Sequence, residues 1–330
     1  MKKLISKLIE HQKLSFEESK DLIYKIAYNE ANEAQMAAIL TAYVMRHITI
    51  DEISGFRCAL LELAQTVNLN DGDVMDLCGT GGDGKNTFNI STLSSFVVAA
   101  AGVPVAKHGN YGVSSVSGSS NVMEMLGYRF SNSASKLNEE LKNTGITFLH
   151  APLFHPALKA VAPIRQQLGI KTFFNLMGPL VNPSNPTYQL CGVYNAEVGR
   201  IYSYLLQSQD KKFNVVYSLD GYDEVSLTSP IKVFSTKGES LLNFQNYGLQ
   251  NVNPYEIEGG KTLESSARIF IEILQGKGSP SQNRVIVANS ALALKCYYED
   301  KSLSTCIELA KEMLESGKAF NTFKNLINGQ

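Results

Sequence analysis

The sequence predicts an α/β protein in which a small all-helical domain is joined to a large domain with a mostly parallel central sheet covered by helices. Residues 1–68 place their apolar side chains at helical spacing only, with no run typical of a strand. After residue 68, short apolar runs bounded by turn residues alternate with helical stretches, which is the pattern of parallel βα units. We therefore assign 1–68 to the helical domain, and 69–159 with 184–330 to the α/β domain.

The composition supports two domains with large cores and argues against several classes of protein. The chain has 330 residues, of which 44% are hydrophobic. Its 30 basic and 31 acidic residues give a formal net charge of −1, so no basic excess favours nucleic acid as a partner. The five cysteines form no C-x-x-C pair and indicate reduced thiols in a cytoplasmic protein. The most apolar run, 96–106, is too short to span a bilayer, so no membrane partner is expected.

The helices of the first domain are predicted from apolar stripes, which lie at 4–9, 22–26 and 37–45. Ser15 and Glu18 form an S-x-x-E capping box that opens the second helix. Asp51 is expected to cap a further helix that runs through residue 64. The stripes suit a homodimer surface and, equally well, closure of the domain's own core.

The α/β domain is predicted to alternate strands with helices along most of its length. The expected strands are 74–78, 103–107, 147–150, 189–194 and 214–218, and the expected helices between them are 93–101, 121–126, 134–143 and 196–207. Prolines interrupt this pattern around a helix at 156–168, and we expect the segment near 160–183 to return to the helical domain. The helices expected in the last third are 263–274, 281–298 and 302–315.

A cluster of glycines directly after the first expected strand predicts a phosphate site, because glycine allows a tight turn and close approach of a ligand to the backbone. The glycines are Gly79, Gly81, Gly82 and Gly84. Asn89, Ser91 and Thr92 then open a helix whose N–H groups and dipole attract an anion. The cluster also matches dinucleotide and P-loop patterns, but only weakly. Asn86 replaces the Ser or Thr of a P-loop, and Lys107 stands where a dinucleotide site needs an acid.

A second anion-binding segment follows the next expected strand. Lys107 supplies a positive charge there, and the Ser- and Gly-rich residues 109–120 offer N–H and hydroxyl groups that can wrap an anion. Such a run is also typical of a solvated loop, but its place at the carboxyl end of a strand favours binding. His108 is a candidate acid or base, or a simple hydrogen-bond donor.

Adjacent carboxylates after the strand 214–218 predict a magnesium site. Asp223 and Glu224 offer oxygen ligands for a Mg²⁺ ion that also binds substrate phosphates. The alternative is an acidic turn without a ligand.

Arg165, on the helix 156–168, could clamp a carboxylate with two N–H donors or could simply be solvated. No G-x-S-x-G elbow or other nucleophile signature indicates covalent catalysis.

Six strings occur along the chain in a characteristic order and spacing. They are GTGGDGKNTFNIST (79–92), KHGN (107–110), VSSVSGSSNVMEMLG (113–127), PIRQQLG (163–169), FNLMGPLVNP (174–183) and DEVSL (223–227). With them the chain resembles the anthranilate phosphoribosyltransferase family over essentially its whole length. The resemblance implies a nucleoside phosphorylase-type fold, a homodimer and a reaction of tryptophan biosynthesis. In that reaction anthranilate and 5-phosphoribosyl 1-diphosphate (PRPP) give N-(5-phosphoribosyl)anthranilate and pyrophosphate.

The resemblance also implies which residues bind each substrate. Those implied for PRPP are Gly79, Gly82, Asp83, Thr87, Asn89, Ile90, Ser91, Thr92, Lys107, His108, Gly109, Ser114, Ser115 and Ser119. Those implied for anthranilate are Gly79, Asn110 and Arg165, with Arg165 facing the carboxylate. Ser91, Asp223 and Glu224 would carry one or two Mg²⁺ ions. No general base is assigned, because the substrate's own carboxylate can help to take the proton.

Two residues depart from the pattern common in this family. Tyr111 and Val116 stand where many members carry arginine and lysine, so two positive charges are missing near the phosphates. We expect weaker diphosphate binding than in those members, or compensation by Lys85 or another base. Two alternatives remain, a pyrimidine nucleoside phosphorylase-like enzyme and a non-catalytic nucleic-acid-binding paralogue of the same fold. The acidic pair argues against the first alternative and the net charge against the second.

Overall fold

The computed structural model describes residues 1–69, 72–112 and 117–330. The chain divides into two compact units, which we treat separately. The helical unit comprises Met1–Val67 and Ala151–Pro183, and the sheet unit comprises Asn68–His150 and Ser184–Gln330. The segment that returns to the helical unit begins at Ala151, earlier than the expected start near residue 160. The reason is that a short helix begins directly where the preceding strand ends.

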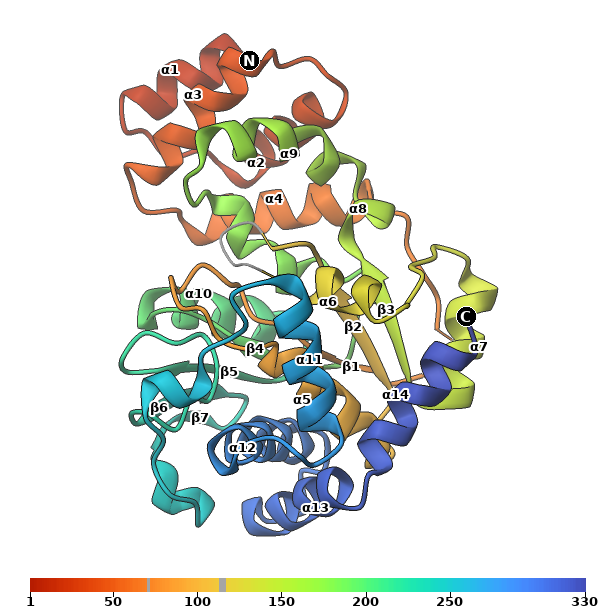
Figure 1. Cartoon of the computed structure of the whole chain (residues 1–330). Coiled ribbons are helices and arrows are strands. Elements are labelled where there is room, and N and C mark those ends of the chain that lie inside the picture. Colours follow the sequence, from red (N-terminus) through yellow and green to blue (C-terminus); the bar gives the residue numbers. More distant parts are fainter. Residues whose placement is uncertain (70–71, 113–116) are drawn as a thin grey trace. The chain divides into compact units, whose positions relative to one another are not determined.

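The helical unit is built from short helices (Figure 1). Its elements are α1 Lys2–Ile9, α2 Phe16–Ala27, α3 Glu33–Val44, α4 Ile50–Glu62, α8 Ala151–Phe154, α9 Pro156–Leu168 and the 3₁₀ helices η1 Phe173–Leu176 and η2 Gly178–Leu180. Helix α2 packs against both α4 and α9. Gly55 permits the close approach of α4 to α2, because a Cβ atom there would lie 2.4 Å from the carbonyl oxygen of Phe16.

The helix caps of this unit confirm one prediction and correct another. The capping box of Ser15 and Glu18 is present at the start of α2. Asp51 does not cap α4; the cap is Thr49, which forms a capping box with Glu52. The carboxylate of Glu52 is fully buried, and it also accepts hydrogen bonds from the backbone of Leu14 at 2.9 Å and from Arg46 Nη1 at 3.1 Å. Burial therefore fixes the start of α4 two residues before the expected cap.

Among the described residues of the sheet unit, seven strands form one sheet in the order β3-β2-β1-β4-β5-β6-β7. The strands are β1 Met75–Leu77, β2 Val105–Gly109, β3 Ile146–His150, β4 Tyr188–Gly192, β5 Lys212–Ser218, β6 Ile231–Ser235 and β7 Gly238–Leu242. The first five run parallel to their neighbours, whereas β6 and β7 add an antiparallel hairpin. The mostly parallel sheet and its five parallel strands are therefore confirmed, but the hairpin was not predicted.

Helices cover this sheet. They are α5 Ile90–Ala100, α6 Ser119–Met125, α7 Ala134–Thr144, α10 Ala196–Gln207, α11 Leu263–Leu274, α12 Pro280–Tyr297, α13 Leu303–Glu315 and α14 Lys318–Asn328, with 3₁₀ turns η3 Phe244–Tyr247 and η4 Pro254–Ile257. Helix α14 was not predicted, although Ala319, Phe323 and Leu326 form its buried stripe. None of the described helices is both long and apolar enough to cross a membrane.

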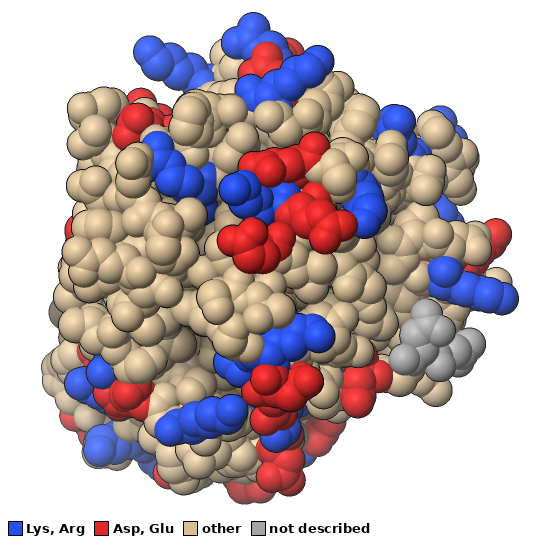
Figure 2. Space-filling view, turned by 90° about the horizontal axis from the view of Figure 1, so that it is seen from below, with Lys and Arg blue, Asp and Glu red and all other residues tan. Residues whose placement is uncertain are grey.

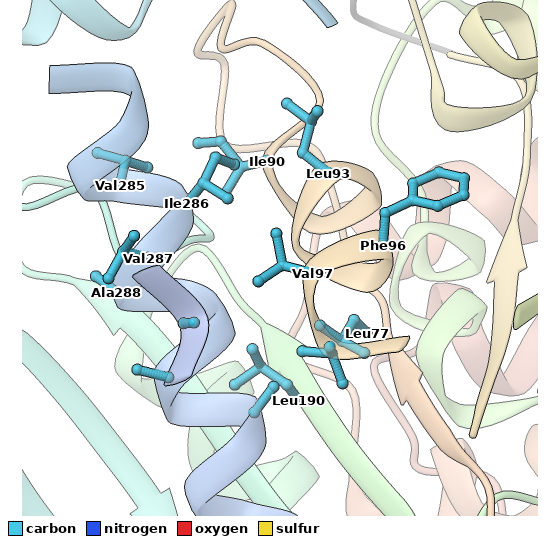
Figure 3. Close-up of a cluster of buried hydrophobic side chains, with 14 of the residues drawn as sticks. Leu77, Ile90, Leu93, Phe96, Val97, Leu190, Val285, Ile286, Val287 and Ala288 are labelled. Atoms are coloured by element: carbon cyan, nitrogen blue, oxygen red, sulfur yellow. The ribbon is translucent and has the colours of Figure 1, made fainter. Parts of the chain in front are cut away.

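The core of the sheet unit lies where α5 and α12 meet the sheet. Figure 3 shows apolar side chains of the two helices beside Leu77 of β1 and Leu190 of β4, with Ile90 and Val97 of α5 directed toward α12. Those labelled on the helices are Ile90, Leu93, Phe96, Val97, Val285, Ile286, Val287 and Ala288. This packing fixes the start of α5 relative to the end of β1, and so it holds the glycine turn between them.

The outer surface carries no large single-sign patch on the face seen in Figure 2, where acidic and basic side chains are interspersed. This distribution agrees with the formal net charge of −1. It gives no support on this face to the basic surface that a nucleic-acid-binding protein uses.

Candidate functional site

The glycine turn after β1 adopts the backbone conformation that its sequence predicts. Gly81, Gly82 and Gly84 have φ angles of 63°, 78° and 76°, a region that other residues enter at a cost. Asn89 occupies the N-cap of α5 without a side-chain capping hydrogen bond. Its Nδ2 donates instead to the carbonyl oxygen of Ser117 at 3.3 Å, which ties the turn to the second predicted segment. The first turn of α5 therefore keeps N–H groups for an anion.

The acidic pair packs directly on this turn. The backbone N–H of Gly81 donates to Asp223 Oδ2 at 2.7 Å. A Cβ atom on Gly79 would lie 2.7 Å from Asp223 Oδ2, and one on Gly192 would lie 1.6 Å from the Asp223 carbonyl oxygen. Glycine is thus required at the end of β4, where the Asp223 backbone would block a Cβ atom, whereas a Cβ atom after β1 would displace the Asp223 carboxylate. The contact brings together two segments that the sequence assigned separately to phosphate and to metal.

The side chain of Lys107, on β2, lies at the same edge of the sheet as the glycine turn. Its side chain is only 1% exposed, and Nζ donates to Ser91 Oγ at 3.3 Å and to the carbonyl oxygen of Leu77. The positive charge acts on Glu224, whose pKa it lowers in part. The three predicted segments thus converge at the carboxyl edge of the sheet, where ligands bind in folds of this class.

The carboxyl groups of Asp223 and Glu224 lie in an environment that disfavours uncompensated negative charge. Burial raises the pKa of Asp223 to about 7, and Asp83 adds repulsion, while the Gly81 N–H acts in the opposite direction. Burial also raises the pKa of Glu224 well above its usual range, and repulsion from Asp223 adds to this effect. A bound cation would offset both effects.

The donor set fits magnesium. Two adjacent carboxylates and the hydroxyl of Ser91 are hard oxygen ligands, which Mg²⁺ prefers. Among the residues that the structure describes, no three His, Cys, Asp or Glu side chains are arranged as a metal cluster. An ion at this site would therefore take further ligands from water and from substrate phosphates, as Mg²⁺ usually does.

Two hydroxyls at this edge have no hydrogen-bond partner among the described residues. They belong to Thr80, in the glycine turn, and to Thr92, in the first turn of α5. Thr92 is 1% exposed and Thr80 is 8% exposed, so an unmade hydrogen bond costs stability at both positions. An anion with several oxygens would give these hydroxyls acceptors, which fits a phosphate-bearing substrate.

The end of the Ser- and Gly-rich segment, at the start of α6, lies close to the end of β2. A Cβ atom on Gly109 would lie 2.6 Å from Ser119 Oγ, so the start of α6 approaches the strand end closely. The carbonyl oxygen of Asn110 accepts from Ser119 Oγ at 3.4 Å and from the Ser120 N–H at 3.2 Å. Ser114, Ser115 and Val116 lie outside the described residues.

The remaining predicted residues take other positions. The side chain of Ile90 is buried in the core, so only its backbone can serve the site, and Thr87 forms a β-bridge with Glu258. The ring of His108 is buried, and the backbone N–H of this residue donates to Asp76 Oδ1 at 3.1 Å. Arg165 belongs to the helical unit, where its Nη2 donates to Asn175 Oδ1 at 3.3 Å. Its Nε has no partner among the described residues.

Residues that sequence reasoning missed hold the acidic pair in place. Asn289, in the middle of α12, is fully buried and bonds both backbone groups of Val225, at 3.0 Å to the nitrogen and 2.9 Å to the oxygen. Ser218 Oγ donates to the Glu224 carbonyl oxygen at 2.8 Å. An asparagine within the apolar stretch 285–294 is a signal of such a contact, but the sequence does not name its partner.

Comparison with known proteins agrees with this geometry. The model of the glycosyl transferase family a/b domain matches residues 71–320, and that of the family's helical bundle domain matches residues 2–64. An anthranilate phosphoribosyltransferase of Flavobacterium johnsoniae is 52% identical over 330 residues, which cover 99% of this chain and 98% of the relative. This chain belongs to the anthranilate phosphoribosyltransferase family. The resemblance drawn from the sequence is confirmed.

Solved structures of the family extend the comparison. The anthranilate phosphoribosyltransferase of Thermus thermophilus superposes with a TM-score of 0.91 at 31% identity, covering 98% of each chain. The Saccharomyces cerevisiae enzyme in complex with PRPP and Mg gives a TM-score of 0.90 at 27% identity, covering 98% of this chain and 96% of that chain. These family members support the anthranilate phosphoribosyltransferase assignment over the phosphorylase-like and nucleic-acid-binding alternatives.

Proposed function

We propose that this protein transfers the 5-phosphoribosyl group of PRPP to the amino group of anthranilate and releases pyrophosphate, a reaction of tryptophan biosynthesis. The convergence of the glycine turn, Lys107 and the acidic pair at one edge of the sheet carries this proposal. The full-length relatives that bear this enzyme name support it.

The reaction breaks the bond between C1 of the ribose and the diphosphate oxygen, and it forms a bond between C1 and the anthranilate nitrogen, which then loses a proton. Negative charge grows on the departing pyrophosphate. The N–H groups of the first turn of α5, the hydroxyl of Thr92 and the ammonium of Lys107 would stabilise that charge, because they are already oriented before the reaction.

The metal is part of the proposal. Ser91, Asp223 and Glu224 would hold one or two Mg²⁺ ions, which supply positive charge to the leaving pyrophosphate when bound. The complex of the Saccharomyces cerevisiae enzyme with PRPP and Mg supports a role for magnesium. The Gly81 N–H and the Asn289 side chain keep the acidic segment in place for the ion.

We propose Gly79, Asn110 and Arg165 as the residues that contact anthranilate, with Arg165 facing its carboxylate. The Arg165 Nε atom without a partner is available for a carboxylate. A Saccharomyces cerevisiae relative in complex with 4-fluoroanthranilate supports a substrate of this class. Positioning the weakly nucleophilic aniline nitrogen near C1 is then the main task of the protein, so no strong general base is required.

We also propose that two copies pair through the helical unit. Its apolar side chains at Ile9, Tyr28 and Met45 are 65%, 64% and 72% exposed. Light scattering of wild type and an Ile9→Glu, Met45→Glu variant tests this proposal, and a variant that keeps the wild-type mass contradicts it.

We also propose a cytoplasmic location, which the five cysteines free of disulfides support.

The function is tested by following the loss of anthranilate fluorescence with PRPP and Mg²⁺. Wild type should consume anthranilate, and the double variant Asp223→Asn, Glu224→Gln should lose turnover while keeping its circular dichroism spectrum. A wild-type protein that consumes no anthranilate under these conditions refutes the proposed reaction. Undiminished turnover in the variant refutes the metal assignment.

A further inference from the structure

A cavity of about 590 Å³ lies in the sheet unit between η3, the first turns of α12 and one side of α13. None of its lining residues belongs to the predicted substrate or metal set. A cavity of this size falls in the range that proteins use for small organic ligands.

Two polar atoms in residues lining this cavity lack partners. The hydroxyl of Tyr247 and the Oδ1 atom of Asn283 have no hydrogen bond among the described residues. Tyr247 is only 2% exposed, and burial raises the pKa of its phenol. A buried hydroxyl and a buried amide oxygen left unpaired destabilise the fold, so an external partner at each is favourable.

The rest of the lining combines apolar and charged side chains. Val287 and Ile307 are buried and give the cavity an apolar wall. Lys311 and Glu308 lie on the exposed side of α13, and neither makes an ion pair among the described residues. Arg284 adds a second cation, held by a hydrogen bond from Nε to the Pro280 carbonyl oxygen at 3.0 Å.

We propose that this cavity is a binding site for an apolar L-α-amino acid. The ligand's carboxylate pairs with Lys311 and accepts from the Tyr247 hydroxyl. Its ammonium group donates to Asn283 Oδ1 and to the carboxylate of Glu308, and its side chain packs on Val287 and Ile307. Charges of both signs beside an apolar wall match a zwitterion better than they match a simple anion or cation.

Calorimetric titration of the full-length protein with each standard L-amino acid in turn tests the site. We expect saturable binding of at least one apolar amino acid with a Kd below about 1 mM. Tyr247→Phe and Lys311→Ala should each weaken that binding by about tenfold or more. Tyr247→Phe should also raise the melting temperature of the ligand-free protein, because it removes an unpaired hydroxyl.

Matched controls separate this site from general surface effects. Tyr255→Phe removes a hydroxyl from a side chain that is 70% exposed, and Lys261→Ala removes an exposed charge, so both should leave binding unchanged. The proposal is overturned if no amino acid binds saturably, or if the two site variants bind as tightly as the controls. Equal binding of n-hexanoate, which lacks the ammonium group, also overturns it. None of these readouts depends on phosphoribosyl transfer.

Discussion

The backbone N–H of Gly81 donates a hydrogen bond to the carboxylate of Asp223 at 2.7 Å, although 142 positions separate the two residues in the chain. This contact joins the turn after β1 to the segment after β5. The glycine turn, predicted to bind phosphate, and the acidic pair, predicted to bind metal, are therefore directly linked. Substitutions on either side should affect both ligands.

Gly79→Ala tests this coupling most directly. The new Cβ atom would lie 2.7 Å from Asp223 Oδ2, so the carboxylate must shift. We expect a stability loss of about 1–3 kcal/mol, as for other overpacked sites, together with a large loss of Mg²⁺-dependent turnover. Thermal unfolding and the anthranilate assay measure the two effects. Gly329→Ala is the control, because its Cβ atom would meet nothing closer than 3.4 Å. Full activity in Gly79→Ala contradicts the coupling.

Replacing the buried cation of β2 should weaken diphosphate binding. Lys107→Met keeps the length of the side chain but removes the charge that faces Ser91 and Glu224. We expect pyrophosphate affinity in the presence of Mg²⁺ to fall by about tenfold or more. Lys212→Met, which removes a surface lysine paired with Glu299, should leave that affinity unchanged. Calorimetric titration of the two variants with pyrophosphate and Mg²⁺ measures both affinities. Equal affinities refute a role for Lys107 in diphosphate binding.

The two departures from the family pattern make a separate prediction. The Tyr111 hydroxyl donates to Glu124 Oε1 at 2.8 Å, so an arginine at 111 would keep an acidic neighbour. Tyr111→Arg with Val116→Lys restores two positive charges, and we expect tighter diphosphate binding than in wild type. An affinity no higher than that of wild type contradicts the prediction. Lys85→Ala in the wild-type background then tests whether Lys85 already compensates.

Magnesium affinity should depend on pH through Asp223. Burial raises the pKa of this carboxyl to about 7, and the ion binds only the deprotonated form. Below that pH a proton competes with Mg²⁺, so the apparent affinity should fall by up to about tenfold per pH unit. The raised pKa of Glu224, the second carboxylate ligand, adds to this pH dependence in the same direction. Calorimetric titration with Mg²⁺ and pyrophosphate from pH 5.5 to 8.5 measures this profile, and an affinity independent of pH excludes Asp223 as the titrating ligand.

The metal-free protein should show the opposite trend in stability. Asp223 binds its proton more tightly in the folded state than in the unfolded state, where its pKa is near 3.8. Its contribution to stability is therefore present at low pH and is lost as the pH rises from about 4 to about 7. Asp223→Asn should remove this part of the pH dependence in thermal unfolding experiments without Mg²⁺. An unchanged pH profile in that variant contradicts the raised pKa.

The parallel strands and the glycine turn could be predicted because each depends on a local pattern. The run 74–78 is apolar and ends in glycines, and Ser15 with Glu18 is a complete capping signal in four residues. Strand β7 was missed because residues 238–241 of GESLL are exposed, so the segment lacks the alternation that marks a half-buried strand.

Contacts between distant segments account for what the sequence could not supply. Glu52 caps α4 from a buried position that depends on Leu14 and Arg46, so the choice between Thr49 and Asp51 is not local. Asn289 is a polar residue in an apolar helix, yet its partner Val225 becomes evident only once α12 packs beside the end of β5.

The backbone of Asp223 occupies the volume that a side chain at Gly192 would need. The acidic segment is thus wedged between two strand ends and has little freedom to adopt another path. Exchanging the carboxylates alone, in order to alter the ion preference of this protein, would leave this close packing of the backbone unchanged. Redesign of the ion preference would have to vary the turns after β1 and β4 together with the segment 220–224.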